Sequence, residues 1–134
     1  MLSESVEVVI RFITAVNNRN VDSIAELISE DHQFKDSLGN TFRGKDVMIK
    51  GWRNYLLLFP DYKIEVDEIY RIENKVMFTG KASGTYLSAG ELSKENHWEI
   101  DAAWRAVVEN GKVKEWQVFG DNKPVYDIIE RNRK

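Results

Sequence analysis

Cysteine is absent from the sequence. Disulfides, thiol catalysis, thiolate metal sites and iron–sulfur clusters are therefore excluded together. Proline occurs only twice, and no repeat or low-complexity stretch divides the chain. A chain of 134 residues has the usual size of one domain, so residues 1–134 are predicted to form a single domain.

The chain also lacks an excess of positive charge. Its 19 basic and 22 acidic residues give a net charge of −3, and neither half is strongly basic, so we expect no nucleic-acid partner. Glu4, Glu7 and Arg11 interrupt the apolar start of the chain, which predicts neither a signal peptide nor a membrane span. We expect a cytoplasmic protein that does not contact a membrane.

Patterns that bind metals or phosphates are missing as well. His32 and His97 are far apart, and no His-x-His or H-E-x-x-H spacing occurs. Gly39, Gly44 and Gly51 do not form a phosphate-binding loop, and no G-x-S-x-G motif marks a nucleophilic serine. We therefore expect neither a metal nor a cofactor.

The hydrophobic pattern that is present changes once along the chain. Apolar residues recur with helical spacing over residues 3–17 and 44–58, and Asp22 is predicted to cap a short helix between them. Pro60 ends the helical part. Alternating strands are then predicted over residues 62–72, 75–87, 97–108 and 112–120. A short strand is predicted over 32–36 and a short helix over 124–131. Helices followed by antiparallel strands indicate the α+β class.

Three local motifs extend this interpretation: Phe59-Pro60-Asp61, Gly84-Thr85-Tyr86, and Gly111-Lys112-Val113 followed by Trp116, Phe119 and Asp121. Together they resemble the SnoaL-like polyketide cyclases and ketosteroid isomerases of the nuclear-transport-factor-two-like superfamily. The resemblance covers almost the whole chain. It implies N-terminal helices packed in a strongly curved antiparallel sheet, a cone-shaped, cystatin-like α+β roll with an apolar pocket inside.

Asp36 is the first catalytic candidate. The segment Asp36-Ser37-Leu38-Gly39 is similar to the ketosteroid isomerase segment that holds the catalytic base. In the other interpretation, Asp36 caps backbone N–H groups of a turn. The isomerase's oxyanion-hole tyrosine and aspartate correspond to Phe12 and Ala103, so steroid isomerisation is not expected.

Asp121 and Asp101 are the other catalytic candidates. Asp121 stands where SnoaL-like cyclases carry an acid/base aspartate, although it is equally explained as the end of a strand. A two-residue turn at Asn110-Gly111 would place Asp101 and Trp116 on one face of the sheet. The isomerase-like register turns that face into the pocket, whereas the cyclase-like register turns the opposite face inward. A β-bulge would reconcile the two registers.

The predicted function follows from these residues and the resemblance. The pocket is expected to take a small, apolar, neutral or anionic molecule. The predicted substrate-binding residues are Phe12, Phe34, Trp52, Tyr55, Trp116 and Phe119. The first hypothesis is a cofactor-free acid/base enzyme, namely a cyclase, isomerase or dehydratase of a carbonyl compound; the second is a non-catalytic binding protein for a hydrophobic ligand; the third is a dimeric adaptor. Because both faces of the sheet carry apolar residues, we also predict a homodimer through the sheet face.

Overall fold

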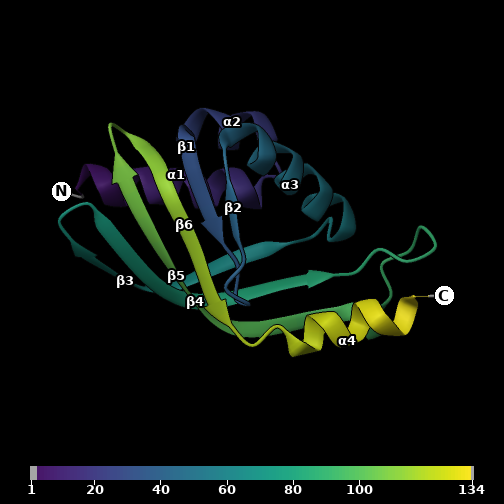
Figure 1. The fold of residues 1–134 in the computed structure, drawn as a ribbon. Helices are drawn as coiled ribbons and strands as arrows, with labels where there is room; N and C mark the ends of the chain where they lie inside the picture. The colour runs from purple at the N-terminus through teal and green to yellow at the C-terminus, as the bar shows by residue number, and fades with distance from the viewer. Residues whose placement is uncertain (1–2, 134) are drawn as a thin grey trace.

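The computed structural model describes residues 3–133 and contains one six-stranded sheet in the order β2-β1-β6-β5-β4-β3 (Figure 1). The helices are α1 (Glu4–Asn17), α2 (Val21–Leu27), α3 (Lys45–Leu58) and α4 (Lys123–Asn132). The strands are β1 (Ile28–Lys35), β2 (Thr41–Arg43), β3 (Lys63–Ile72), β4 (Lys75–Thr85), β5 (His97–Glu109) and β6 (Lys112–Gly120). All strand pairs are antiparallel except β1 with β6, which is parallel. The predicted α+β class and curved sheet are confirmed.

The N-terminal helices begin at polar caps. The Ser3 hydroxyl accepts a hydrogen bond from the Val6 amide at 3.2 Å, and the apolar stripe of α1 is buried. The cap predicted for α2 is wrong: Asn20 caps the helix by accepting from the Ser23 amide at 3.1 Å, and Asp22 lies in the first turn. No helix within residues 3–133 is long and apolar enough to cross a membrane.

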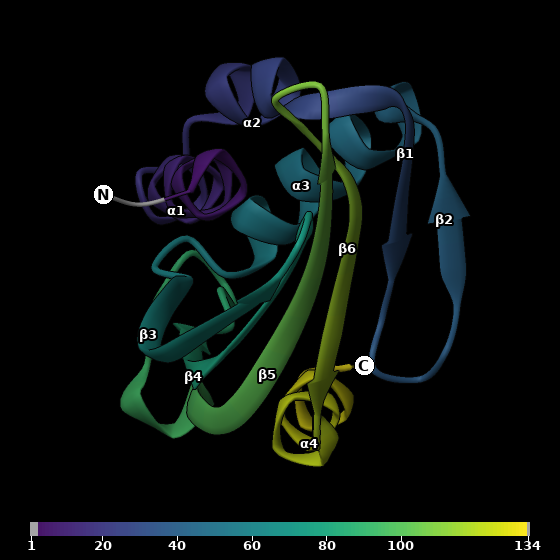
Figure 2. The same ribbon diagram turned by 90° about the vertical axis from the view of Figure 1, so that its left-hand side faces the viewer.

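The sheet curves around the helices. Figure 2 shows α1 and α3 on its concave side, with β5 bending strongly along its length. A bulge in β3 between Val66 and Glu68 increases the local twist. Opposite that bulge, Gly80, Ala102 and Gly120 are cross-strand neighbours on β4, β5 and β6. Small residues at these positions let the backbones approach closely where the sheet turns.

Two of the motifs that carried the resemblance meet in space. The Asp61 carboxylate accepts hydrogen bonds from the Thr85 amide at 2.6 Å and from the Thr85 hydroxyl at 2.7 Å. The Phe59 ring also contacts Tyr86 of the second motif, with centroids 5.9 Å apart. These contacts tie the end of α3 to the end of β4. The Phe-Pro-Asp and Gly-Thr-Tyr segments therefore serve the fold, because each one satisfies or packs against the other.

A second bulge decides which face of β5 and β6 points inward. Val107 pairs with Glu115 and Val108 pairs with Val113, which leaves Lys114 unpaired. The register expected from a simple two-residue hairpin is therefore wrong beyond this point. Trp116 pairs with Ala106 on the concave face and no longer shares a face with Asp101.

The convex face is largely charged. Lys81 pairs with Asp101 at 2.8 Å and Arg105 pairs with Glu115 at 2.9 Å. The apolar face of β5, which includes the almost fully buried Trp104, points into the cone. The reason given for a homodimer, an apolar face left uncovered, is therefore wrong.

Candidate functional site

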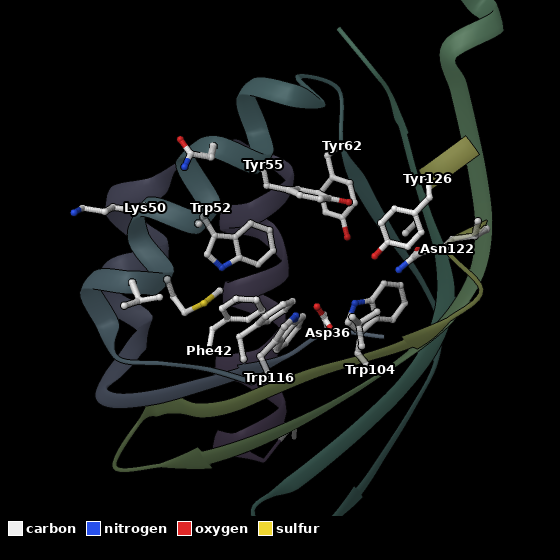
Figure 3. Close-up of a pocket in the computed structure, with 18 of the residues that line it drawn as sticks. Asp36, Phe42, Lys50, Trp52, Tyr55, Tyr62, Trp104, Trp116, Asn122 and Tyr126 are labelled. Atoms are coloured by element: carbon white, nitrogen blue, oxygen red, sulfur yellow. The ribbon is translucent and has the colours of Figure 1, made fainter. Parts of the chain in front are cut away.

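A cavity of about 600 Å³ lies between α3 and the concave face of the sheet (Figure 3). Nine of its nineteen lining residues are aromatic. They are Phe34, Phe42, Trp52, Tyr55, Tyr62, Trp98, Trp104, Trp116 and Tyr126. The other lining residues are Asp36, Val47, Met48, Lys50, Gly51, Asn54, Ala82, Ile100, Val118 and Asn122. The volume and the apolar lining are typical of a site for a small organic molecule.

Helix α3 supplies one wall of this cavity. Met48, Trp52 and Tyr55 follow one another at helical spacing and share a face of α3. The Tyr55 ring contacts Trp52 and Tyr62 edge-on, at centroid distances of 6.3 and 5.0 Å. These mutual contacts fix the rings, so the wall is preformed.

Strands β5 and β6 supply the opposite wall. The Trp104 indole stacks on Phe78, with centroids 4.7 Å apart and an angle of 9° between the planes. Trp116 packs against Phe12 at 4.4 Å. Phe12 is fully buried and is absent from the cavity lining, so it supports Trp116 from behind. Phe12, one of the predicted substrate-binding residues, therefore does not line this cavity.

Asp36 follows β1 and lies at the cavity. Its carboxylate accepts three hydrogen bonds from its own loop: from the Leu38 amide at 3.0 Å, the Asn40 amide at 2.9 Å and the Asn40 side chain at 3.1 Å. Figure 3 shows this carboxylate between Trp116 and Trp104. The turn-capping role and the position in the pocket are therefore both present in one side chain.

Helix α4 carries the remaining polar groups. Asn122 donates to the Ser37 hydroxyl at 2.5 Å, and at the far end Arg131 and Asn132 donate to the side-chain oxygen of buried Asn96 at 3.1 and 3.0 Å. Both ends of α4 are thus tied to the rest of the domain. The helix thereby presents Tyr126 to the cavity (Figure 3).

Three tyrosine hydroxyls at the cavity are held in the protonated form. Burial raises the pKa of Tyr62, and burial together with the nearby Tyr62 and Tyr126 raises the pKa of Tyr55. The pKa of Tyr126 is raised by partial burial and, secondly, by the negative charge of Asp36. At neutral pH each hydroxyl can therefore donate a hydrogen bond to a bound molecule.

The cavity opens between β2, α3 and α4. The lining residues Phe42, Val47 and Tyr126 lie there and are 43%, 48% and 44% exposed. The inner part is nearly closed, since Trp98 and Trp104 are 4% and 1% exposed. A molecule can therefore enter past these three side chains and bind against the buried indoles.

The other two catalytic candidates lie outside the cavity lining. The side chain of Asp101 is 88% exposed on the convex face and pairs with Lys81. Asp121 is exposed and accepts a hydrogen bond at 3.0 Å from the amide of Lys123, the first residue of α4. Phe119 points to the convex face and is 43% exposed. Asp101 and Phe119 are therefore on the convex side of β5 and β6, and Asp121 follows the end of β6.

Several lining residues were missed by the sequence analysis. The strongest examples are Tyr62, Trp98, Trp104 and Tyr126. Trp98 and Trp104 share the parity of Ile100, so the apolar side of β5 was a usable signal once its direction was known. Tyr126 had no signal, because α4 is packed by contacts that are distant in the sequence.

His32 is fully buried and does not line the cavity. Its Nδ1 contacts the Val113 carbonyl at 2.7 Å, so that nitrogen carries the proton, and Nε2 has no hydrogen-bond partner within residues 3–133. Burial lowers the pKa of His32, since the charged ring would lose its hydration. The described residues contain no cluster of three histidine, aspartate or glutamate side chains that could hold a metal ion.

The curved sheet, its N-terminal helices and the aromatic cavity together form a cone-shaped α+β domain. The family model described as SnoaL-like domain matches residues 9–116. The chain therefore belongs to the SnoaL-like domain family. No curated protein matches the sequence significantly.

Solved structures share the fold at low sequence identity. A protein assigned as a SnoaL-like polyketide cyclase from Shewanella putrefaciens CN-32 is 14% identical, with a TM-score of 0.82 and coverage of 98% of this chain and 99% of that one. An LEH-like epoxide hydrolase from M. tuberculosis is 13% identical, with a TM-score of 0.78 and coverage of 96% and 91%. A protein with a ketosteroid isomerase-like fold from Catenulispora acidiphila, in complex with trimethylamine, is 15% identical, with a TM-score of 0.76 and coverage of 89% and 88%.

Proposed function

We propose that this chain binds a small, largely apolar molecule inside its cone. The observation that carries the proposal is the preformed cavity of about 600 Å³ with nine aromatic side chains in its wall. Burial of apolar ligand surface against such a wall provides the binding free energy, and the few polar groups orient the molecule. A similar fold, that of the Catenulispora acidiphila protein, was solved in complex with the small molecule trimethylamine, which supports a small-molecule ligand for this chain.

Filling the cavity tests the proposal. Val118 lines the cavity and Gln117 is its neighbour in β6 with the opposite side-chain direction. We expect Val118→Phe to reduce the affinity for planar aromatic and terpenoid ketones by about tenfold or more, because the added ring takes their space. Gln117→Phe adds the same ring outside and should leave affinity unchanged. Isothermal titration measures both, and equal binding by the two variants would contradict the proposal.

Acid/base catalysis is a second candidate function, and one observation favours it. The Asp36 carboxylate and the Tyr126 hydroxyl both line the cavity and interact electrostatically. In this scheme Asp36 takes a proton from the carbon beside a carbonyl group, so that a C–H bond breaks and an O–H bond forms. The protonated Tyr126 donates a hydrogen bond to the developing enolate oxygen. Returning the proton to another carbon completes an isomerisation. In a cyclisation the enolate carbon attacks a second carbonyl carbon of the same molecule, the C=O π bond opens, and the new alkoxide takes the proton back from Asp36.

Exchange of substrate protons with deuterated water tests this second function. Asp36→Asn keeps Oδ1 as the acceptor for the Leu38 and Asn40 amides and removes the base. We expect it to slow exchange at the carbon beside the carbonyl of a bound ketone by about 100-fold or more. Asp101→Asn and Asp121→Asn are the matched controls and should exchange at the wild-type rate. Wild-type exchange by Asp36→Asn, measured by NMR, would exclude the mechanism.

The homodimer and the cytoplasmic location stay predictions. The convex face retains half-exposed apolar side chains, Met77 and Phe119, beside its ion pairs. A dimer through this face should sediment at about twice the 15.6 kDa chain mass. Phe119→Glu should then shift the protein to monomers without affecting ligand binding. A wild-type monomer at high micromolar concentration would contradict the predicted dimer.

A further inference from the structure

The charge inside the cavity is one-sided. Asp36 is the one carboxylate among the described lining residues, and Lys50 is the one cationic lining residue. Lys50 is exposed, and Figure 3 shows its amino group pointing away from the cavity. All three hydrogen-bond donors to Asp36 are neutral amides, so they orient the carboxylate without neutralising its charge. The cavity therefore has a negative electrostatic potential near Asp36.

The aromatic wall adds to this potential. Phe78 stacks on one face of the Trp104 indole, and Trp104 lines the cavity. Trp116 is likewise backed by Phe12 and lies on the other side of Asp36 (Figure 3). The face of an indole is its electron-rich side, and tryptophan is the strongest cation–π partner among the side chains. A carboxylate between two such indoles is a suitable environment for an alkylated cation.

We infer that the molecule bound in this cone carries a positively charged, alkyl-substituted amine. The inference rests on the proposed function and names the class of its ligand. The ammonium group lies beside Asp36 and the Trp104 and Trp116 indoles, and its apolar body extends toward Trp52 and Tyr55. An anionic ligand would be repelled by Asp36. A neutral ligand would leave the Asp36 carboxylate without a counter-ion in a partly dehydrated site. This inference differs from the neutral or anionic ligand expected from the sequence.

Three probes of nearly equal shape test this inference. They are benzyltrimethylammonium, its neutral carbon isostere neopentylbenzene, and the anion phenylmethanesulfonate. All four tryptophans of the chain line the cavity, so intrinsic fluorescence reports on binding there. We expect the cation to bind about tenfold more tightly than the neutral isostere, and the anion to bind most weakly.

Two variants identify the source of the preference. Asp36→Asn should reduce the ratio of cation to neutral affinity by about threefold or more and leave the affinity for neopentylbenzene unchanged. Asp101→Asn makes the same change on the convex face, outside the cavity lining, and should leave the ratio unchanged. Equal or tighter binding of the neutral isostere to the wild type would overturn the inference and leave the cavity as a ligand site. Absence of binding by all three probes would overturn both the inference and the proposed function.

Discussion

Replacing Gly80 by alanine should be severely destabilising, because the curvature of the sheet depends on that position. Gly80 lies in β4 opposite the bulge of β3. A Cβ atom added there would lie 1.9 Å from the Glu65 carbonyl oxygen, 2.9 Å from the Glu65 carbonyl carbon and 3.2 Å from the Val66 Cα. All three neighbours are backbone atoms, so no side-chain rotation can relieve the overlap.

The magnitude follows from what must move. To restore a normal contact of 3.4 Å or more, β3 must move away from β4 by more than an ångström. Overpacking of this kind costs about 1–3 kcal/mol, and hydrogen bonds lost at the bulge add about 1 kcal/mol each. The conformational advantage of alanine over glycine returns less than about 1 kcal/mol. We expect the free energy of unfolding to fall by about 3 kcal/mol or more.

A matched substitution should have the opposite sign. Gly51 lies within α3, and a Cβ atom there would meet only the Met48 side chain, at 3.8 and 4.0 Å. Alanine at this helical position should raise the free energy of unfolding by about 0.5–1 kcal/mol. Urea unfolding followed by circular dichroism measures both variants, and unchanged m-values justify the comparison.

The reasoning would be refuted by a mild Gly80→Ala variant. If the free energy of unfolding fell by less than about 0.5 kcal/mol, β3 would be free to shift and the bulge would not require glycine. A destabilising Gly51→Ala would show that the effect of the two substitutions on stability is not set by the space around the added methyl group. The two results together separate steric overlap from backbone entropy.

Two further predictions concern buried polar groups. The pKa of His32 is lowered from 6.5 by burial, so the unfolded chain takes up a proton at a higher pH than the folded one does. The contribution of His32 to stability is therefore complete above pH 6.5 and is lost as the pH falls below it. His32→Leu should flatten this loss in urea titrations between about pH 8 and 5, and an unchanged pH dependence would contradict a buried, neutral His32. Asp61→Ala leaves the buried Thr85 amide and hydroxyl without their carboxylate acceptor and should lower the free energy of unfolding by about 2–3 kcal/mol. Asp61→Asn keeps one acceptor oxygen and should lower it by about half as much. Equal losses of stability in the two variants would contradict the hydrogen bonds between Asp61 and Thr85.

The sequence by itself determined the elements and the class. The apolar stripe of α1, the stop at Pro60 and the alternation after it are local patterns, and each produced the predicted helix or strand. Trp52 and Tyr55, two of the predicted substrate-binding residues, both line the cavity, because the helical period places them on one face of α3. The family resemblance carried by Phe59-Pro60-Asp61 was also correct. This segment and its contact partner, Gly84-Thr85-Tyr86, are both short motifs that can be read directly from the sequence.

The tertiary structure decided which carboxylate and which aromatic rings share the cavity. One unpaired residue, Lys114, shifts β6 by a single position, and a shift by one turns every later side chain to the other face. That shift brings Trp116 into the cone, and the direction of β5 leaves Asp101 outside it. Tyr126 enters only because α4 is tied at both ends by contacts with distant residues. The strand pattern in a sequence shows that side chains alternate between two faces, but it does not show which face lines the cavity. Tertiary packing decided that here.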